Sequence, residues 1–360
     1  MKCAVIGGGI NGVMSAWALA KRGHQVDLYE CGQLMGATSS ASTKLIHGGL
    51  RYLEAGEFRL VREALRERLF WLNSAPDLVH RIELILPVYR WSRRARWLLG
   101  TGLFLYDHLA GKANLGRHRW LSPAELQQKI PDLNSADLLG GFAFFDAQMD
   151  DHALGLWAAE MARRSGTNIT TCATVQAVST TAAVNLNGST LSYDVVINAA
   201  GPWAEALLHQ SGIASVHHLD LVRGSHLLLN RPISHGLLVE SPHEERFCFI
   251  LPYKEKTLLG TTEVRQTLND PIECTPEEQA YLLNIYNHYI RVQAAENEIS
   301  GKFAGLRPLI RSSANQSRAT REYAIEVHGR LLTIFGGKWT TAHALGEKVA
   351  SKAESLANRS

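Results

Sequence analysis

Three glycines near the start of the chain have the type and spacing needed to bind a dinucleotide. Gly7, Gly9 and Gly12 form a GxGxxG pattern. The first glycine permits a tight turn, the second lets the backbone approach a pyrophosphate, and the third allows a helix to pack closely on a strand. The free N–H groups of that helix would bind the phosphates, and Glu30 would accept hydrogen bonds from a ribose. The pattern predicts dinucleotide binding but does not separate NAD from FAD.

A second stretch, residues 39–54, places polar side chains beside a pair of glycines. Its sequence, SSASTKLIHGGLRYLE, follows neither helical nor strand periodicity across its whole length. Small hydroxyl residues come first, and groups that can bind or react follow in close succession: Lys44, His47, Gly48, Gly49, Arg51 and Tyr52. We interpret the segment as irregular because its backbone follows a bound cofactor rather than a helix or a sheet.

These residues need a scaffold, and the hydrophobic pattern around them predicts one. A buried strand at 3–6, a helix over about 10–21 and a strand at 25–30 would carry the glycine motif. Capping boxes with proline at the first helical position, SPAE at 122–125 and TPEE at 275–278, predict two helix starts. The other predicted elements are helices at 57–73, 123–130, 151–164 and 276–292, strands at 193–201, 219–229, 236–240, 247–251 and 257–262, and a strand–turn–helix unit at 330–350.

Elements of the nucleotide-binding type recur in three separate parts of the chain, which predicts two interleaved domains rather than two consecutive ones. We assign 1–73, 151–204 and 301–360 to an α/β domain of the Rossmann type. The segments 74–150 and 205–300 would form a second domain, with an antiparallel sheet that binds the substrate. The predicted fold class is therefore α/β, and α+β over the whole chain.

Composition excludes several classes of protein. The chain has 360 residues and a net charge of +3 without a long basic tract, so we expect no nucleic-acid partner. Five scattered cysteines without a CxxC pair indicate neither a disulfide framework nor a metal site, and they favour a reducing, cytoplasmic location. No apolar run has the length of a transmembrane helix, and three consecutive glycines argue against a signal peptide. The composition does not fix an oligomeric state.

Several stretches, in order along nearly the whole chain, match one family. They are IGGGINGVMSA (6–16), ATSSASTKLIHGGLRYLEAGEFRLVREAL (37–65), GLFLYDHLA (102–110), NAAGPWA (198–204), LVRGSHLLL (221–229), LLGTTE (258–263), GLRPL (305–309), TREYAIEVH (320–328) and TIFGGKWTT (333–341). In these stretches the chain resembles the FAD-dependent glycerol-3-phosphate dehydrogenases, within the D-amino-acid-oxidase-like flavoproteins. Members of that family commonly carry a further helical domain after the FGGK region, and we expect this chain to lack it.

The resemblance implies a cofactor and a reaction. It implies an FAD-binding domain of the glutathione-reductase/D-amino-acid-oxidase type, with FAD held noncovalently, and oxidation of sn-glycerol 3-phosphate to dihydroxyacetone phosphate. Electrons would then pass to a quinone or to oxygen. Val175 would lie at the end of a short strand near the adenosine. The implied cofactor-binding residues are Gly7, Gly9, Ile10, Asn11, Gly12, Glu30, Thr38, Ser39, Ser42, Lys44, His47, Gly48, Gly49, Val175, Ala200, Gly201, Trp203, Gly336, Gly337, Lys338, Trp339 and Thr340.

That reaction removes a hydride from a carbon and a proton from its hydroxyl group. The site therefore needs residues that bind the phosphate, a proton acceptor and a group that stabilises negative charge. Planar guanidinium groups suit a phosphate, and a histidine suits proton transfer near neutral pH. The substrate-binding residues implied by the resemblance are Arg51, Tyr52, Arg307, Arg321 and His226. The implied catalytic residues are His47, His226, Lys338 and Arg307, and the sequence does not decide which histidine is the base.

Residues 89–106, YRWSRRARWLLGTGLFLY, interleave arginines with tryptophans and then become apolar. Such a composition is typical of a segment on an anionic membrane surface, and equally of a solvated basic loop followed by a core segment. A quinone acceptor favours the membrane interpretation. The protein would then be peripheral on the cytoplasmic face of the inner membrane.

Two other functions fit the same fold. The first is an oxidase or dehydrogenase of an amino acid or a 2-hydroxy acid. Its carboxylate substrate needs one well-placed arginine, whereas this sequence offers at least three candidate cations for a phosphate. The second is a non-catalytic flavin-binding subunit, which the short C-terminal part suggests and the complete set of site residues opposes.

Overall fold

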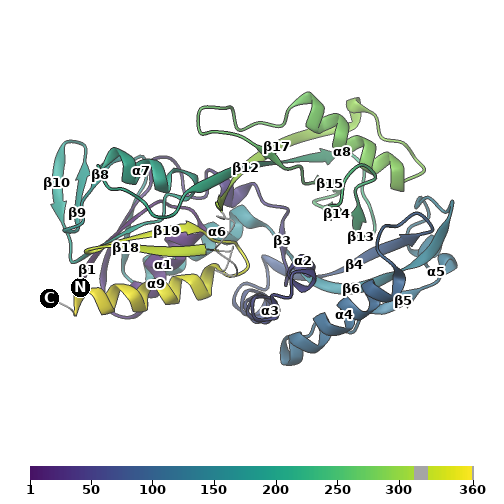
Figure 1. The fold of residues 1–360 in the computed structure, drawn as a ribbon, viewed down its shortest axis with the longest axis horizontal. Helices are drawn as coiled ribbons and strands as arrows, with labels where there is room; N and C mark the ends of the chain where they lie inside the picture. Colours follow the sequence, from purple (N-terminus) through teal and green to yellow (C-terminus); the bar gives the residue numbers. More distant parts are fainter. Residues whose placement is uncertain (312–322, 359–360) are drawn as a thin grey trace.

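The protein consists of two halves, each built around one large sheet (Figure 1). This computed structural model describes residues 1–311 and 323–358. Within those ranges the first sheet has six strands in the order β18–β19–β11–β1–β2–β7, all parallel except β18. They are β1 (Lys2–Ile6), β2 (Gln25–Tyr29), β7 (Thr167–Thr170), β11 (Val195–Asn198), β18 (Tyr323–His328) and β19 (Leu331–Gly336).

Apolar residues on both faces of β1 explain why the first sheet is covered on both sides. Cys3 and Val5 pack among the helices of one face, whereas Ala4 and Ile6 join a separate cluster on the other. The first face carries the helices α1 (Ile10–Lys21), α6 (Asp151–Arg164) and α9 (Ala342–Ala357). The opposite face carries α7 (Ala204–Gln210) and a small sheet of β8 (Val175–Val178), β9 (Ala183–Leu186) and β10 (Ser189–Ser192).

The second half is a mainly antiparallel sheet in which distant parts of the chain pair. In the part of the chain that is described, its order is β16–β12–β15–β14–β13–β4–β6–β3, with β17 beside β12 and β5 beside β6. The pair β13–β4 is parallel. The strands are β3 (Leu45–Ile46), β4 (Val79–Tyr89), β5 (Arg119–Leu121), β6 (Leu138–Met149), β12 (Leu219–Leu229), β13 (Gly236–Glu240), β14 (Phe247–Tyr253), β15 (Lys256–Gly260), β16 (Val264–Arg265) and β17 (Ile299–Ile310).

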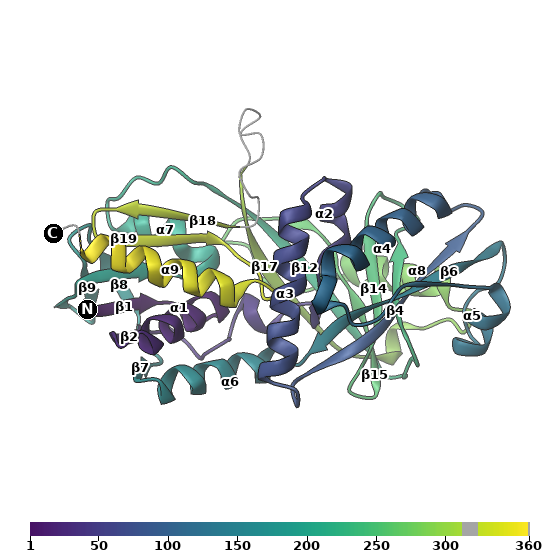
Figure 2. The same cartoon turned by 90° about the horizontal axis from the view of Figure 1, so that it is seen from below.

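Helices cover the second sheet and occupy the boundary between the halves. The predicted capping boxes are confirmed, because Ser122 and Thr275 each accept a backbone N–H in the first turn of their helices. Figure 2 shows α3 near the middle of the molecule, between α9 of the first half and α4 of the second. These helices are α2 (Leu50–Glu54), α3 (Phe58–Ser74), α4 (Arg96–Ala110), α5 (Pro123–Lys129) and α8 (Pro276–Tyr289), with 3-10 turns at Thr38–Ser40, Gly111–Ala113, Gly201–Trp203 and Glu296–Glu298.

The predicted α/β fold with a second antiparallel sheet is confirmed, and two local expectations are corrected. The 39–54 segment is not irregular throughout, because it contains β3 and α2; Leu45 and Ile46 pair with β6. Residues 299–310 form β17, which pairs with β12 in the second sheet. Residues 301–310 therefore belong to the second sheet, although we assigned them to the first domain. Within 1–311 and 323–358, no helix combines the length and the apolar character needed to cross a membrane.

Candidate functional site

The glycine motif forms the tight turn between β1 and α1 that its spacing predicts. Gly7 has a φ of +110°, which favours glycine, and a Cβ there would lie 2.4 Å from the carbonyl oxygen of Ala199. A Cβ at Gly12 would lie 2.0 Å from the carbonyl oxygen of Gly7. Both glycines are therefore required for α1 to pack closely on the strands. That packing directs the free N–H groups of α1 toward the turn.

Glu30 lies directly after β2, beside the same turn. One of its carboxylate oxygens accepts the N–H of Gly8 at 2.6 Å, and the other accepts the N–H of Gly32 at 2.8 Å. These bonds hold the carboxylate at the carboxyl ends of the parallel strands, where Rossmann-type folds bind a ribose. The position of Glu30 therefore fits its predicted role.

Three chain segments meet at the N-terminus of α1. Ser39 Oγ accepts the N–H of Ile10 at 2.9 Å, and the indole N–H of Trp339 donates to the carbonyl oxygen of Ser39 at 2.7 Å. The side-chain amide of Asn11 donates to the carbonyl oxygen of Gly336 at 3.1 Å. Asn11 Oδ1 is buried and has no hydrogen-bond partner among the described residues. The loop after β19 and the start of the 39–54 segment therefore close around the glycine turn.

A buried acid holds the next part of the 39–54 segment. Asp151, at the start of α6, accepts a hydrogen bond from Ser42 Oγ at 2.7 Å and pairs with Lys44 Nζ at 2.6 Å. Lys44 also donates to the carbonyl oxygen of Ser40 at 2.7 Å. The charge of Lys44 is therefore largely neutralised within the protein, and its contact with a cofactor stays a prediction.

Other predicted cofactor residues lie directly after β11, at the start of β8 and in the 3-10 turn Thr38–Ser40. Ala200, Gly201 and Trp203 come directly after β11, and Gly201 has a φ of +56°. Val175 opens β8 instead of ending a strand, which corrects its expected place. Thr38 Oγ1 donates to a backbone carbonyl of β17 at 2.7 Å, so it joins the two halves.

A second group of predicted residues meets where the turn after β3 faces the loop after β19. Lys338 Nζ lies 4.0 Å from the centre of the Tyr52 ring. Thr340 Oγ1 accepts the backbone N–H of His47 at 3.3 Å. Gly49 has a φ of +76°, and a Cβ there would lie 2.4 Å from the Tyr52 ring, so this glycine lets Tyr52 fold back over the turn. The turn thus brings a histidine, a tyrosine and a lysine together.

His47 is suited to accept a proton. Its ring is half-buried, with its centre 6.3 Å from the centre of the Phe249 ring. Burial lowers the pKa of His47 below its ordinary value of 6.5; the negative charge of Asp146 opposes this shift, while Lys338 and Arg68 add to it. A lowered pKa keeps the imidazole neutral near pH 7 and able to take a proton.

His226, the other predicted proton acceptor, is enclosed. It is 0% exposed, its ring stacks on Phe303 with centres 4.8 Å apart, and its Nε2 lies 3.0 Å from Thr43 Oγ1. Burial lowers the pKa of His226 well below its ordinary value, and the positive charge of Arg307 contributes. We infer that His47 is the better candidate for the base, because its ring is the more accessible of the two.

Arg307 extends from β17 across the neighbouring strand β12. A Cβ at Gly224 would lie 2.3 Å from Arg307 Nη2, so the glycine makes room for the guanidinium. Nη2 donates to Thr261 Oγ1 at 2.7 Å, and Nη1 donates to the carbonyl oxygen of Thr262 at 3.4 Å. These contacts fix the direction of the half-buried side chain. Of the other predicted arginines, Arg51 lies on α2 and Arg321 lies outside the described residues, so their roles stay predictions.

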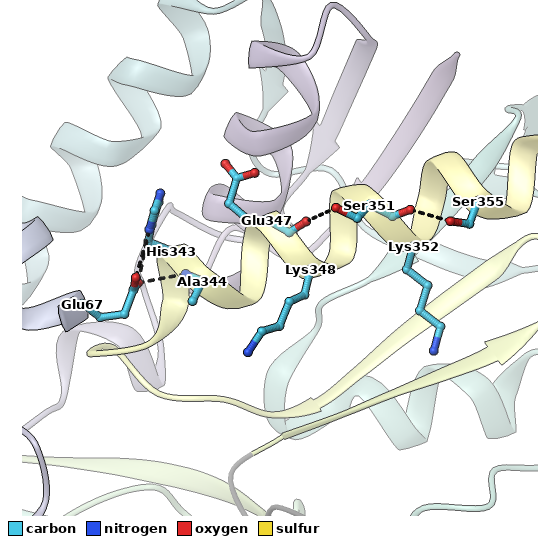
Figure 3. Close-up of a pocket in the computed structure, with 8 residues that line it drawn as sticks. All are labelled: Glu67, His343, Ala344, Glu347, Lys348, Ser351, Lys352 and Ser355. Atoms are coloured by element: carbon cyan, nitrogen blue, oxygen red, sulfur yellow. Dashed lines mark hydrogen bonds and ion pairs between the residues drawn. The ribbon is translucent and has the colours of Figure 1, made fainter. Parts of the chain in front are cut away.

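Helix α3 fixes the loop that carries Lys338. Glu67 accepts the N–H of Ala344 at 2.9 Å, in the first turn of α9, with His343 Nδ1 beside it at 3.3 Å (Figure 3). One helical turn away, the indole N–H of Trp71 donates to the carbonyl oxygen of Thr340 at 3.2 Å. The end of this loop and the first turn of α9 are therefore held by two residues of α3.

Comparison with known proteins shows the family of this chain. A family model described as FAD dependent oxidoreductase matches residues 2–352. The chain belongs to this family. FAD is therefore its cofactor, and the chain is an enzyme of the oxidoreductase class.

Among members of the FAD dependent oxidoreductase family, the chain is similar to enzymes named for polyol phosphates. It is 36% identical to a glycerol-3-phosphate dehydrogenase of Pseudomonas tolaasii, over 97% of this chain and 70% of the relative. It is also 36% identical to a D-erythritol 1-phosphate dehydrogenase of Brucella abortus, over 96% of this chain and 72% of the relative. The structure of a Bacillus halodurans glycerol-3-phosphate dehydrogenase complexed with FAD has a TM-score of 0.80 and 24% identity, and covers 99% of this chain and 65% of that chain.

The residues of this oxidoreductase fit FAD. The turn from Gly7 to Gly12 and the N-terminus of α1 would hold the pyrophosphate, and Glu30 would hold the ribose. In the first turn of α1, the buried Asn11 Oδ1, which has no hydrogen-bond partner among the described residues, offers a further hydrogen-bond acceptor. A Cβ at Gly337 would lie 2.3 Å from the Asn11 amide nitrogen, so only a glycine there lets the loop after β19 approach Asn11 this closely.

Replacing Gly7 with alanine should prevent the protein from retaining FAD. The substitution combines a positive φ with a Cβ placed 2.4 Å from a backbone oxygen, so the turn must move. Such strain costs roughly 3 kcal/mol, equivalent to about 100-fold weaker binding. The measurement is the ratio of visible flavin absorbance to protein absorbance after purification. Gly102→Ala is the control, because a Cβ there meets nothing within 4 Å; normal flavin content in Gly7→Ala would contradict the prediction.

Several residues that hold the site were not predicted from the sequence. Three of them are buried acids: Asp151 bonds to Lys44, Asp146 bonds to Tyr106, and Glu67 bonds to the first turn of α9. One signal was present, because Asp146 interrupts the apolar run LLGGFAFFDAQM of β6. An acid within a buried strand is normally paired, so its presence indicates a buried cation or hydroxyl nearby.

Proposed function

We propose that this chain oxidises sn-glycerol 3-phosphate to dihydroxyacetone phosphate with FAD as cofactor. The observation that carries the proposal is the meeting of half-buried His47, in the turn after β3, with the loop after β19, where Lys338 lies over the ring of Tyr52. The 36% identical relatives named for this substrate support it. A proton acceptor and a cation in one place are what oxidation of a secondary alcohol requires.

Each of these residues has a chemical role in the proposed reaction. Bound FAD supplies the hydride acceptor. A ring nitrogen of His47 takes the proton of the substrate hydroxyl, which is possible because the imidazole is neutral. Lys338 stabilises negative charge that develops beside it, and Arg307 binds the phosphate through its guanidinium. A quinone or oxygen is the proposed final electron acceptor.

Anaerobic reduction of the bound flavin tests this function. The purified yellow protein is mixed without oxygen with glycerol 3-phosphate, glycerol, glycine or lactate, and the visible flavin absorbance is followed. We expect rapid bleaching with glycerol 3-phosphate alone. Bleaching only by glycine or lactate would favour the amino-acid or 2-hydroxy-acid oxidase, and no bleaching by any compound would favour the non-catalytic flavin-binding subunit.

D-erythritol 1-phosphate is a second candidate substrate, because a dehydrogenase named for it is as similar in sequence, at 36% identity, as those named for glycerol 3-phosphate. Both substrates carry a phosphate and a secondary hydroxyl, so the same base and cations would serve. The ratio of kcat/KM for the two compounds, measured with one enzyme preparation, decides between them. We expect the ratio to favour glycerol 3-phosphate.

We also infer a cytoplasmic protein with a peripheral contact to the inner membrane, made by α4. This helix exposes Trp97, Leu98 and Phe104, and the side chain of Trp97 is 73% exposed. Exposed Arg90 and Arg93 precede the helix. An apolar helix face next to basic residues suits the interface of an anionic membrane, where a quinone acceptor would also lie.

Acidic substitution of this face should weaken membrane binding without affecting catalysis. In Trp97→Glu/Phe104→Glu, two apolar side chains become anions, so binding to phosphatidylglycerol vesicles should fall by about tenfold or more. Vesicle co-sedimentation gives the binding, and turnover with a soluble dye should not change. Val216→Glu is the control, since Val216 is 74% exposed on the other half of the molecule. Equal vesicle binding by both variants would rule out α4 as the contact.

A further inference from the structure

Three buried polar side chains lie behind the turn that carries His47, and the proposed mechanism uses none of them. Arg68 of α3, Tyr106 of α4 and Asp146 of β6 are at most 2% exposed. Asp146 Oδ1 accepts a hydrogen bond from Tyr106 Oη and another from Arg68 Nη1, each at 2.7 Å. Three separate elements therefore join at one carboxylate.

The remaining bonds of Arg68 make this cluster rigid. Its Nη1 donates to the carbonyl oxygen of Phe145 at 2.9 Å, and its Nη2 donates to the carbonyl oxygen of Ala113 at 2.8 Å. A buried guanidinium that is bonded to a carboxylate and to two backbone carbonyls has little freedom to move. The carboxylate of Asp146 is therefore held in place from the side of α3.

Tyr106 connects this cluster to the turn that carries His47. Tyr106 Oη accepts the backbone N–H of Gly48, the residue after His47, at 2.7 Å. A Cβ at Gly48 would lie 2.7 Å from this same hydroxyl, so the glycine allows the contact. In the antiparallel pair of β3 and β6, Leu45 lies opposite Gln148 and Ile46 lies opposite Ala147. If this register is continued by one residue, Asp146 lies opposite His47.

Three charged side chains from different parts of the fold affect the pKa of His47. Lys338 lies in the loop after β19, Arg68 in α3 and Asp146 in β6. Burial and the two cations lower the pKa of His47, whereas Asp146 raises it. Asp146 is thus the one group of the three that favours proton uptake by the ring.

We propose that Asp146 and Tyr106, braced by Arg68, are positioning residues that fix the His47–Gly48 peptide and so aim His47 at the substrate hydroxyl. Tyr106 acts through geometry, because its hydroxyl anchors the peptide that follows His47. Asp146 acts through geometry and charge, because it orients Tyr106 and faces His47. This role rests on the proposed function, in which His47 is the base.

Tyr106→Phe tests the geometric part in the FAD-loaded enzyme. Loss of the hydroxyl frees the Gly48 N–H, and displacement of a catalytic group by a fraction of an ångström to 1 Å lowers kcat by roughly 10- to 100-fold. We expect KM to stay within about twofold, since the substrate contacts remain. The matched control is Tyr289→Phe, because Tyr289 is equally buried and donates to a backbone carbonyl at 2.7 Å in the second half. Equal kcat in both variants overturns the proposal.

Asp146→Asn tests the charge part with a readout that does not depend on turnover. The titration of His47 is followed by NMR of the FAD-loaded protein labelled with ¹³C at histidine Cε1, with the signal assigned by its loss in His47→Gln. We expect a lower pKa for His47 in Asp146→Asn and an unchanged pKa in Tyr106→Phe. An unchanged or raised pKa in Asp146→Asn overturns the charge role. If Asp146→Asn does not fold, Tyr106→Phe alone decides.

Failure of this proposal is distinguishable from failure of the proposed function. If glycerol 3-phosphate does not bleach the wild-type flavin, the function is wrong, yet the His47 titration still reports the effect of Asp146. If glycerol 3-phosphate bleaches the flavin in Tyr106→Phe at the wild-type rate, the function stands and the positioning role is wrong.

Discussion

Replacing His47 with glutamine should lower kcat for glycerol 3-phosphate by about 10²- to 10⁴-fold while FAD stays bound, because the substitution removes the proposed proton acceptor. His47 has a lowered pKa and lies in the turn before α2, the helix that carries Tyr52, whose ring faces Lys338. Glutamine keeps the size and polarity of the side chain but cannot accept the proton. Single-turnover reduction of the flavin measures the chemical step directly.

The pH dependence follows from the same pKa. A base must be unprotonated to act, so activity is present above the pKa of His47 and is lost as the pH falls through it. Burial lowers that pKa, so kcat/KM should fall only below the ordinary value of 6.5. This limb should be absent in His47→Gln.

His226→Gln is the comparison that can contradict the assignment. His226 is fully buried and bonded to Thr43, so its replacement should lower the melting temperature more than it lowers kcat. If His226→Gln loses as much kcat as His47→Gln, with an intact flavin spectrum, the role of base passes to His226.

Replacing Arg307 with leucine should raise KM for glycerol 3-phosphate by about 100-fold and change kcat much less. Arg307 is directed by Thr261 and by the space over Gly224, so its guanidinium has a fixed place. Loss of charge-assisted hydrogen bonds to a phosphate costs roughly 3 kcal/mol, and that cost falls on substrate and transition state alike. Steady-state kinetics over a range of substrate concentrations separate the two constants.

Arg311→Leu is the matched control for Arg307. Arg311 follows the same strand, is exposed and pairs with Asp220 at 3.0 Å, so its loss should leave KM unchanged. An unchanged KM in Arg307→Leu would show that this arginine does not bind the phosphate. A large effect in both variants would indicate a general loss of positive charge rather than a specific contact.

Predictions from sequence succeeded where the signal lay within one element. The GxGxxG turn and both capping boxes were identified because each needs particular residue types a few positions apart. The long strands β4 and β6 were not identified, because much of each is buried and neither shows a clear period of two. The 39–54 segment shows no periodicity because β3 is only two residues long and depends on β6 for its pairing.

The dinucleotide-binding turn, the α/β fold and the resemblance to a family could all be predicted from the sequence alone, since residue types at fixed spacings carry that information. The three-dimensional contacts show that His226 is enclosed whereas His47 is half-buried, that Lys44 is paired with Asp151, and that Tyr106 and Asp146 support the His47 turn. The physical reason is that burial, electrostatic environment and hydrogen-bond partners depend on strands and helices brought together from distant parts of the chain. The hydrophobic periodicity of a single helix or strand cannot predict those contacts.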